Sequence, residues 1–208
     1  MNEVFFDGTF AGWKRAAREA LAAGRDPLHT RWIDAREGQG ELGLDGRELV
    51  LQPADTPSRF RVPREFLELA TEVSCHREES RWALLYRALW RLTHGEPHLL
   101  EVAVDPDVGA LQAMAKTVRR DVHKMRAYVR FREVATAEGP WFVAWFEPQH
   151  HIVEANAPFF VDRFAALRWS ILTPERCAHW DGREVRFTEG VAKSDAPGDD
   201  PKEELWRT

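Results

Sequence analysis

The stretch KTVRRDVHKMRAYVRFREVATAEGPWFVAWF, residues 116–146, changes its hydrophobic period from that of a helix to that of a strand. Up to residue 125 the apolar side chains recur at helical spacing and form one face: Leu111, Met114, Val118, Val122 and Met125. This pattern predicts an amphipathic helix over about residues 106–125. From Ala127 to Val134 apolar and polar residues alternate, which indicates a strand with two different faces. Residues 141–146 are apolar on both faces, so we expect a central strand there.

Downstream of this stretch the sequence predicts one further helix and two further strands. Residues 150–166 have helical character despite Pro158, which favours a kink. Residues 168–172 and 184–188 alternate like strands, and we expect residues 173–182 between them to form a loop. The second half of the chain is therefore predicted to form an antiparallel β-β-α-β-β sheet.

Upstream of the stretch, helices dominate the pattern. Short strands are predicted at Val4–Phe6 and Glu48–Leu51, and helices at residues 10–24, 63–73 and 75–93, the last of them capped by Ser74. The fold class is therefore α+β, with the helical first half packed on one face of the antiparallel sheet. We expect a single domain over residues 1–190, because one core commonly serves a chain of this length. Residues 191–208 read as a flexible acidic linker or the start of a further element.

The charge of the chain reverses locally. Its formal net charge is −5, yet residues 116–132 hold a single acid, Asp121. The basic side chains there are Lys116, Arg119, Arg120, Lys124, Arg126, Arg130 and Arg132. Because phosphate binding is mainly electrostatic, this cluster predicts a nucleic-acid-binding surface. A solvated helix face, with Arg130 and Arg132 paired to acids elsewhere, explains the same residues equally well.

Candidates for metal ligands are weaker. Glu147, His150, Glu154 and His179 (with Asp181 nearby) carry suitable donor atoms, but the HExxH signature is missing. A helix cap and ordinary surface histidines are the simpler interpretation. Cys75 and Cys177 are too few for an all-cysteine iron–sulfur cluster, so we expect no cofactor in this chain.

The tryptophan-rich segments WFVAWF, RWSILTP and AHWDG are expected to anchor the core and its loops rather than to stack on bases. No apolar run is long enough to cross a bilayer, and the N-terminus carries no basic region typical of a signal peptide. We therefore expect a cytoplasmic protein with no membrane partner.

Five blocks together resemble a bacterial domain-of-unknown-function family associated with DNA metabolism: FDGTFAGW, SCHREESRWALLYRALWRL, VHKMRAYVRFREV, WFVAWFEPQHHIVEANAPFFVDRF and RWSILTPERCAHWDG. The resemblance runs from Phe6 to about Phe187. It implies a partner, because similar proteins lie beside a DNA-repair radical SAM protein or are fused at their C-terminus to a UdgX-type uracil-DNA glycosylase. It implies no catalytic residues. Since members continue past this point, we expect the chain to be part of a longer protein.

Three functions follow as hypotheses. The first is an accessory DNA-repair module that binds nucleic acid and works with the glycosylase or the radical SAM protein. The second is a metal-assisted nuclease or hydrolase acting on damaged nucleic acid. The third is a pure protein-interaction module. The sequence itself reveals no catalytic reaction, so whether the chain is an enzyme stays open.

Overall fold

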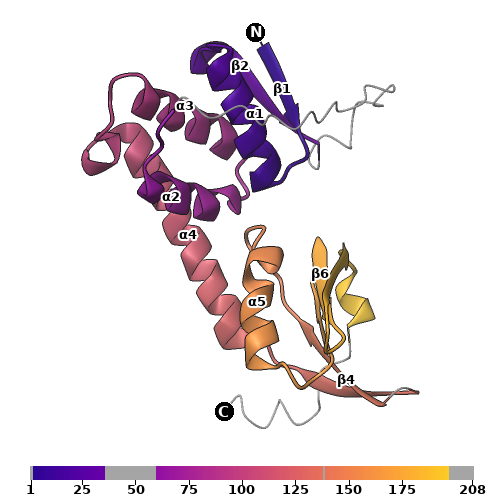
Figure 1. Cartoon of the computed structure of the whole chain (residues 1–208). Coiled ribbons are helices and arrows are strands. Elements are labelled where there is room, and N and C mark those ends of the chain that lie inside the picture. The colour runs from indigo at the N-terminus through magenta and orange to yellow at the C-terminus, as the bar shows by residue number, and fades with distance from the viewer. Residues whose placement is uncertain (1, 36–59, 138, 197–208) are drawn as a thin grey trace, which may run out of the picture. The chain divides into compact units, whose positions relative to one another are not determined.

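The computed structural model describes residues 2–35, 60–137 and 139–196 of the chain. These residues belong to two compact units, which we call unit 1 (residues 1–117) and unit 2 (residues 118–208). The helix α4, Pro106–Tyr128, runs continuously through the boundary (Figure 1). The sequence predicts one domain over residues 1–190. That the two units form one domain and unfold together stays a prediction.

Unit 1 begins with a β-α-β arrangement and continues with helices. Its elements are β1 (Asn2–Phe6), α1 (Phe10–Ala22), η1 (Pro27–His29), β2 (Thr30–Asp34), α2 (Arg64–Ser74), α3 (Arg81–Thr93) and η3 (Leu99–Glu101), followed by the first part of α4. The strands β1 and β2 pair in parallel. The side chain of Thr9 accepts a hydrogen bond from the Gly12 amide at 2.9 Å and so caps α1, as residue types at a helix start predict.

Two predictions for unit 1 need correction and one lies outside the described residues. The strand β2 was missed, because two of its five residues are charged and no alternation marks it. The third helix starts at Arg81 and not at Cys75, because α2 continues through Ser74, whose hydroxyl donates to the Thr71 carbonyl at 2.7 Å. Residues 48–51 lie outside the described part of the chain.

The core of unit 1 is built from aromatic rings. The Trp13 and Trp82 rings stack with centroids 5.9 Å apart, and Phe6 meets Trp82 edge-on at 5.0 Å. Tyr86 and Phe66 are fully buried beside them. The helices of the first half therefore close around a core of their own, whose members all come from unit 1.

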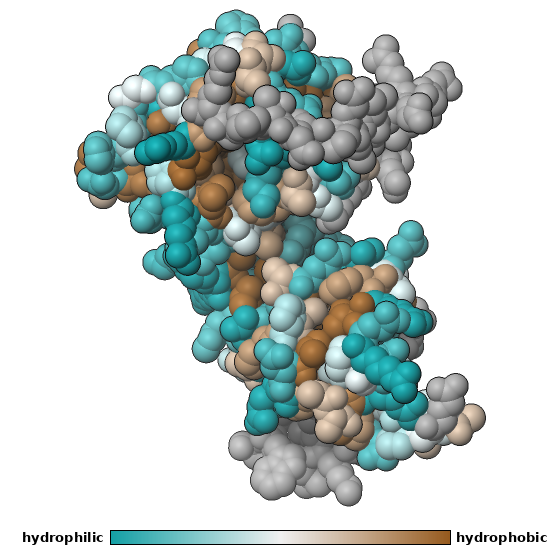
Figure 2. Space-filling model, viewed as in Figure 1, coloured by the Kyte–Doolittle hydropathy of each residue, from teal (hydrophilic) through white to brown (hydrophobic). Residues whose placement is uncertain are grey.

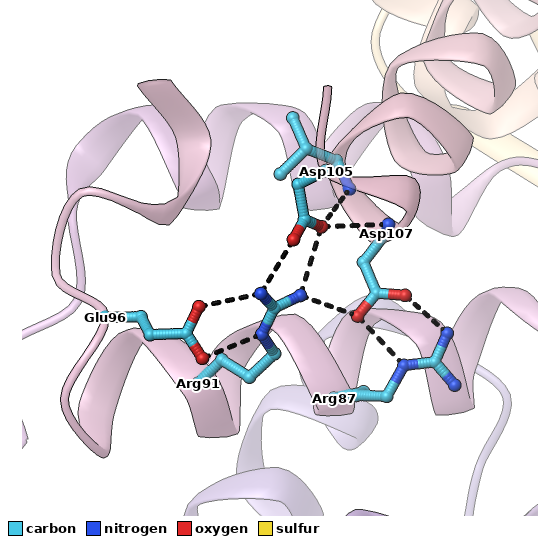
Figure 3. A network of polar contacts seen from close by, with 6 residues as sticks. Arg87, Arg91, Glu96, Asp105 and Asp107 are labelled. Atoms are coloured by element: carbon cyan, nitrogen blue, oxygen red, sulfur yellow. Dashed lines mark hydrogen bonds and ion pairs between the residues drawn. The ribbon is translucent and has the colours of Figure 1, made fainter. Parts of the chain in front are cut away.

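A network of charged side chains joins α3 to the start of α4 (Figure 3). Arg91 donates hydrogen bonds to the carboxylates of Glu96, Asp105 and Asp107 over 2.7–3.0 Å. Arg87 forms a second, two-pronged contact with Asp107 at 2.6 and 3.0 Å. Asp105 also accepts from the Asp107 amide at 2.9 Å, so the same carboxylate caps α4.

Acid should weaken this network. The hydrogen bonds from Arg91 are the main cause that lowers the pKa of Asp105 from 3.8 to about 2 and that lowers the pKa of Glu96. Arg87 does the same to the pKa of Asp107. Because the folded pKa values lie below the ordinary ones, the stabilisation is fully present above the ordinary values and is lost as the pH falls toward 2.

Urea unfolding between pH 6 and pH 2.5 checks this. The variant Arg91→Met should lose stability less steeply over the acid range than the parent chain, because its carboxyls return toward their ordinary pKa values. The control Arg64→Met breaks only the exposed pair with Glu68 and should keep the parent's slope. Equal acid slopes in the parent and Arg91→Met would contradict the assignment.

Unit 2 is a five-stranded sheet with one covering helix. After the second part of α4 come β3 (Arg132–Thr136), β4 (Gly139–Trp145), α5 (Val153–Arg163), β5 (Trp169–Leu172), β6 (Arg176–Trp180), β7 (Val185–Glu189) and η4 (Lys193–Asp195). The strand order is β3-β4-β5-β6-β7. The chain is thus α+β, as predicted.

The sheet differs from the prediction at three places. The strands β4 and β5 pair in parallel, so the sheet is mixed rather than antiparallel, because α5 carries the chain back to the end from which β4 started. Residues 176–180 are the strand β6 and not a loop. The sequence did not predict this strand, because Cys177 and Ala178 interrupt the alternation of apolar and polar residues. The strand β3 begins only at Arg132, because α4 continues to Tyr128.

The helix α5 covers one face of this sheet (Figure 1). Phe160 of α5 meets the Trp169 ring at 6.2 Å, and Phe131 meets the same ring at 5.8 Å. This covering helix comes from within unit 2. That the helices of the first half also pack on one face of the sheet stays a prediction. Pro158 lies inside α5 without ending it.

Of the predicted linker, only residues 191–196 are described, and they include η4. Within the described parts of the chain, no helix combines the length and the apolar character needed to cross a membrane.

Candidate nucleic-acid interface

The seven predicted basic residues lie along α4 and at the start of the sheet. Five are on α4, Arg130 follows its end, and Arg132 is the first residue of β3. Lys116 belongs to unit 1 and the other six to unit 2. We call this set the basic segment: Lys116, Arg119, Arg120, Lys124, Arg126, Arg130 and Arg132.

The basic residues of α4 are exposed, apart from Lys124, which is half-buried. Val118 and Met125 are buried on one side, whereas Lys116 and Arg120, four residues apart, are exposed on the other. Figure 2 shows hydrophilic residues on the left-hand side of the region where Figure 1 draws α4. The helical period that predicted the amphipathic face therefore also decides which cations reach solvent.

The single acid of the segment points inward. Asp121 is 2% exposed, and its carboxylate accepts from the backbone amides of Gln149 at 2.8 Å and His150 at 3.0 Å. Its carboxylate therefore stabilises the turn before α5, and within the described residues Asp121 forms no ion pair with a cation of the basic segment. Lys116, Arg120 and Lys124 likewise form no ion pair within the part of the chain that the structure describes.

The arginines near the end of α4 are positioned by neutral groups. Arg126 donates from Nε to the amide oxygen of Asn156 at 2.6 Å, and its guanidinium lies 4.6 Å from the Phe159 ring centre. Arg130 donates to the carbonyls of Ala127 and Val129 at 2.7 and 3.1 Å. A cation is favourable at this helix end, where carbonyls collect partial negative charge. Arg119 and Arg132 each interact with other residues.

The predicted metal candidates are not brought together. Glu147 accepts from the Trp145 indole at 2.9 Å, and Glu154 binds Arg176 at 2.8 Å. His150 is buried next to Asp121, and His179 lies on β6. Among the residues that the structure describes, no group of three or more His, Cys, Asp or Glu side chains is arranged to hold a metal ion.

Asp181 and Cys177 also have local roles. The Asp181 carboxylate accepts from the amides of Arg183 and Glu184, and these backbone hydrogen bonds lower its pKa. The Cys177 thiol is buried against Thr173 and not against His179. Cys177 and His179 therefore lie on the same strand without forming a thiol–imidazole pair.

One polar arrangement was missed from the sequence. The Trp141 indole nitrogen lies 2.8 Å from the Ser170 hydroxyl, which lies 2.8 Å from Nδ1 of His179. Nε2 of His179 lies 2.9 Å from the Thr188 hydroxyl. Burial lowers the pKa of His179, which favours the neutral ring. Without β6 in the predicted sheet, Ser170 and His179 could not be placed opposite each other.

Comparison with known proteins gives one family and no individual relative. No curated protein and no solved structure matched the chain. The model of a family described as a domain of unknown function, DUF4130, matches residues 79–208. This range exceeds half of the 208 residues and contains α3, all of α4 and unit 2. The chain therefore belongs to the domain-of-unknown-function family DUF4130.

Proposed function

We propose that this chain is a nucleic-acid-binding accessory module of DNA metabolism and that it contacts phosphates through the exposed side of α4. The observation that supports the proposal is the inward position of Asp121, which leaves Lys116, Arg120 and Lys124 without a carboxylate among the described residues. Cations in this state attract a polyanion at long range and release its counterions on contact.

The resemblance to a family associated with DNA metabolism supports a proposal for the partner of this module. We propose that the module works with a UdgX-type uracil-DNA glycosylase or a radical SAM protein, and co-purification with either one tests that part separately.

The nuclease alternative depends on Glu147, Glu154 and His179, which contact other side chains of the protein. No observation favours it over phosphate binding.

Fluorescence anisotropy with a labelled duplex DNA oligonucleotide, titrated with salt, tests the binding. The triple variant Lys116→Glu, Arg120→Glu, Lys124→Glu should bind at least about tenfold more weakly at low salt, because three cations become anions. If each of the three neutralises one phosphate, the slope of log affinity against log salt should fall by about 2.7.

A control with the same change in net charge separates a site from a general charge effect. The variant Arg61→Glu, Arg64→Glu, Arg183→Glu reverses three exposed cations outside the basic segment, two near the start of α2 and one just before β7. It should keep the parent's salt slope. Equal losses in the two triple variants would show that only net charge matters and would overturn the assignment to α4.

A further inference from the structure

The face of the sheet opposite α5 carries a row of side chains that crosses all five strands. The pairing places Arg132 opposite Val143, Val143 opposite Ser170, Ser170 opposite His179, and His179 opposite Arg186. Residues that pair directly in neighbouring strands point to the same face. We call this surface the Trp141 face, because Trp141 lies on it two residues before Val143.

Hydrogen bonds fix the orientation of the Trp141 ring. An indole N–H can only donate, so Ser170 accepts from Trp141 and its own hydroxyl proton is available to Nδ1 of His179. The neutral imidazole then donates from Nε2 to Thr188, whose hydroxyl donates to the Glu189 carbonyl at 3.2 Å. Each group in this series of hydrogen bonds thus donates in the same direction, from β4 through β5 and β6 to β7. The series holds the N–H edge of the Trp141 indole.

The Trp141 face is also cationic and reaches the surface. Arg168 lies just before β5, and its guanidinium lies over the Trp141 ring, 5.4 Å from the ring centre. Trp141 and His179 are half-buried, and Arg186 is exposed and paired with Glu184. By strand register, the Asp and Glu side chains within β3–β7 of the described chain belong to the other face. Glu147, which follows β4, accepts from Trp145 on the Trp141 face, and Arg132 and Arg168 interact with other residues as well.

We propose that the Trp141 face binds an unpaired segment of nucleic acid, with a base stacked on Trp141 and the backbone phosphates near Arg132 and Arg168. The inference rests on the proposed function and adds the substrate class, a single strand. Stacking needs a base that is not paired within a duplex, and an aromatic ring beside arginines provides both stacking and charge. Because the ring is held by its edge, a base can replace the Arg168 guanidinium on it at little cost in conformational entropy of the ring.

The proposal differs from the expectation for part of the tryptophan-rich segments, which were predicted to anchor the core and its loops. Trp169 is a core residue with no exposed surface, as expected. Trp141 lies on the other face of the sheet and is half-buried. The alternation of WFVAWF therefore places Trp141 on the face opposite α5, and Phe142 and Ala144 on the face that carries Trp169.

A double-mutant cycle tests the inference on the full chain. The two protein forms are the parent and Trp141→Ala, and the two ligands are a thymine oligonucleotide and the same strand with abasic sites. The parent should prefer the strand with bases by about five-fold to 150-fold, the range that corresponds to one stacked base. Trp141→Ala should bind both strands with nearly equal affinity, and Trp141→Phe should keep most of the preference.

A second measurement does not depend on the stability of the alanine variant. In protein labelled with fluorotryptophan, the fluorine resonance that disappears in Trp141→Phe belongs to Trp141. That resonance should shift clearly more when the thymine oligonucleotide is added than when the abasic strand is added, because only bases can stack on the ring. Equal shifts with both strands would show that phosphates alone are sensed, and the stacking proposal would be wrong.

The outcomes separate this inference from the α4 proposal. A parent chain that binds both strands equally, with affinity lost in the Lys116/Arg120/Lys124 variant, would overturn the Trp141 face and retain α4. A base preference that depends on Trp141, with no effect of the α4 variant, would support the Trp141 face and overturn the α4 assignment. Duplex affinity should be unchanged by Trp141→Ala, and an equal loss for duplex and single strand would contradict stacking.

Discussion

Replacing Trp82 with alanine should lower the free energy of unfolding of unit 1 by about 3–5 kcal/mol, as for other buried aromatic side chains. Trp82 is 2% exposed and contacts the rings of Trp13 and Phe6. Its indole nitrogen also donates to the Asp34 carboxylate at 3.2 Å. The substitution therefore creates a cavity and removes a hydrogen bond from a buried charge. Urea denaturation followed by circular dichroism measures the loss.

Trp90→Ala is the matched control on the same helix. Trp90 is half-buried and stacks mainly on the exposed His94, with ring centres 3.8 Å apart. Its removal leaves a smaller cavity and should cost clearly less than the removal of Trp82. Equal costs would mean that the aromatic cluster around Trp13 is not the stabilising centre of unit 1.

The same Trp82 variant tests the predicted single domain over residues 1–190. If the two units unfold together, amide hydrogens of β4 and β5 should exchange faster in Trp82→Ala, although these strands lie in unit 2. Unchanged exchange in β4 and β5, with faster exchange in α1 and α3, would show that the units unfold independently.

Asp34→Ala should destabilise unit 1 by about 3–5 kcal/mol, because it removes the carboxylate that faces a buried guanidinium. The Asp34 and Arg81 side chains are 4% and 2% exposed, and Nη2 of Arg81 lies 3.3 Å from Oδ2 of Asp34. Arg81 stays buried in the variant, where its charge is poorly solvated. Thermal and urea unfolding of the purified variant measure the effect.

Two further variants identify the cause. The double variant Asp34→Ala, Arg81→Met removes both charges and should recover part of the loss, because an apolar side chain tolerates burial. Glu68→Ala removes the exposed partner of Arg64 and should change stability little. The single variant Arg81→Met completes the comparison. If the double variant lost as much stability as Asp34→Ala and Arg81→Met together, the buried unpaired charge would not be the cause of the loss.

Local pattern was sufficient for the long helices. The apolar stripe from Leu111 to Met125 predicted α4, and Thr9 and Gly24 marked the ends of the region that forms α1. Pattern failed for β2 and β6, whose short sequences carry charged or small residues and gain their stability from neighbouring strands. It also failed to show that β4 and β5 are parallel, because that depends on the path of α5.

The sequence by itself determined that the chain is α+β, that cations concentrate in residues 116–132 and that α4 has two different faces, because composition and helical period are properties of neighbouring residues. Only the tertiary structure decided that Asp121 turns toward the amides of Gln149 and His150, and that Ser170 meets His179. These contacts join residues 9 to 29 positions apart. They exist because strand register and the packing of α4 near α5 bring distant backbone together, and no local period encodes that pairing.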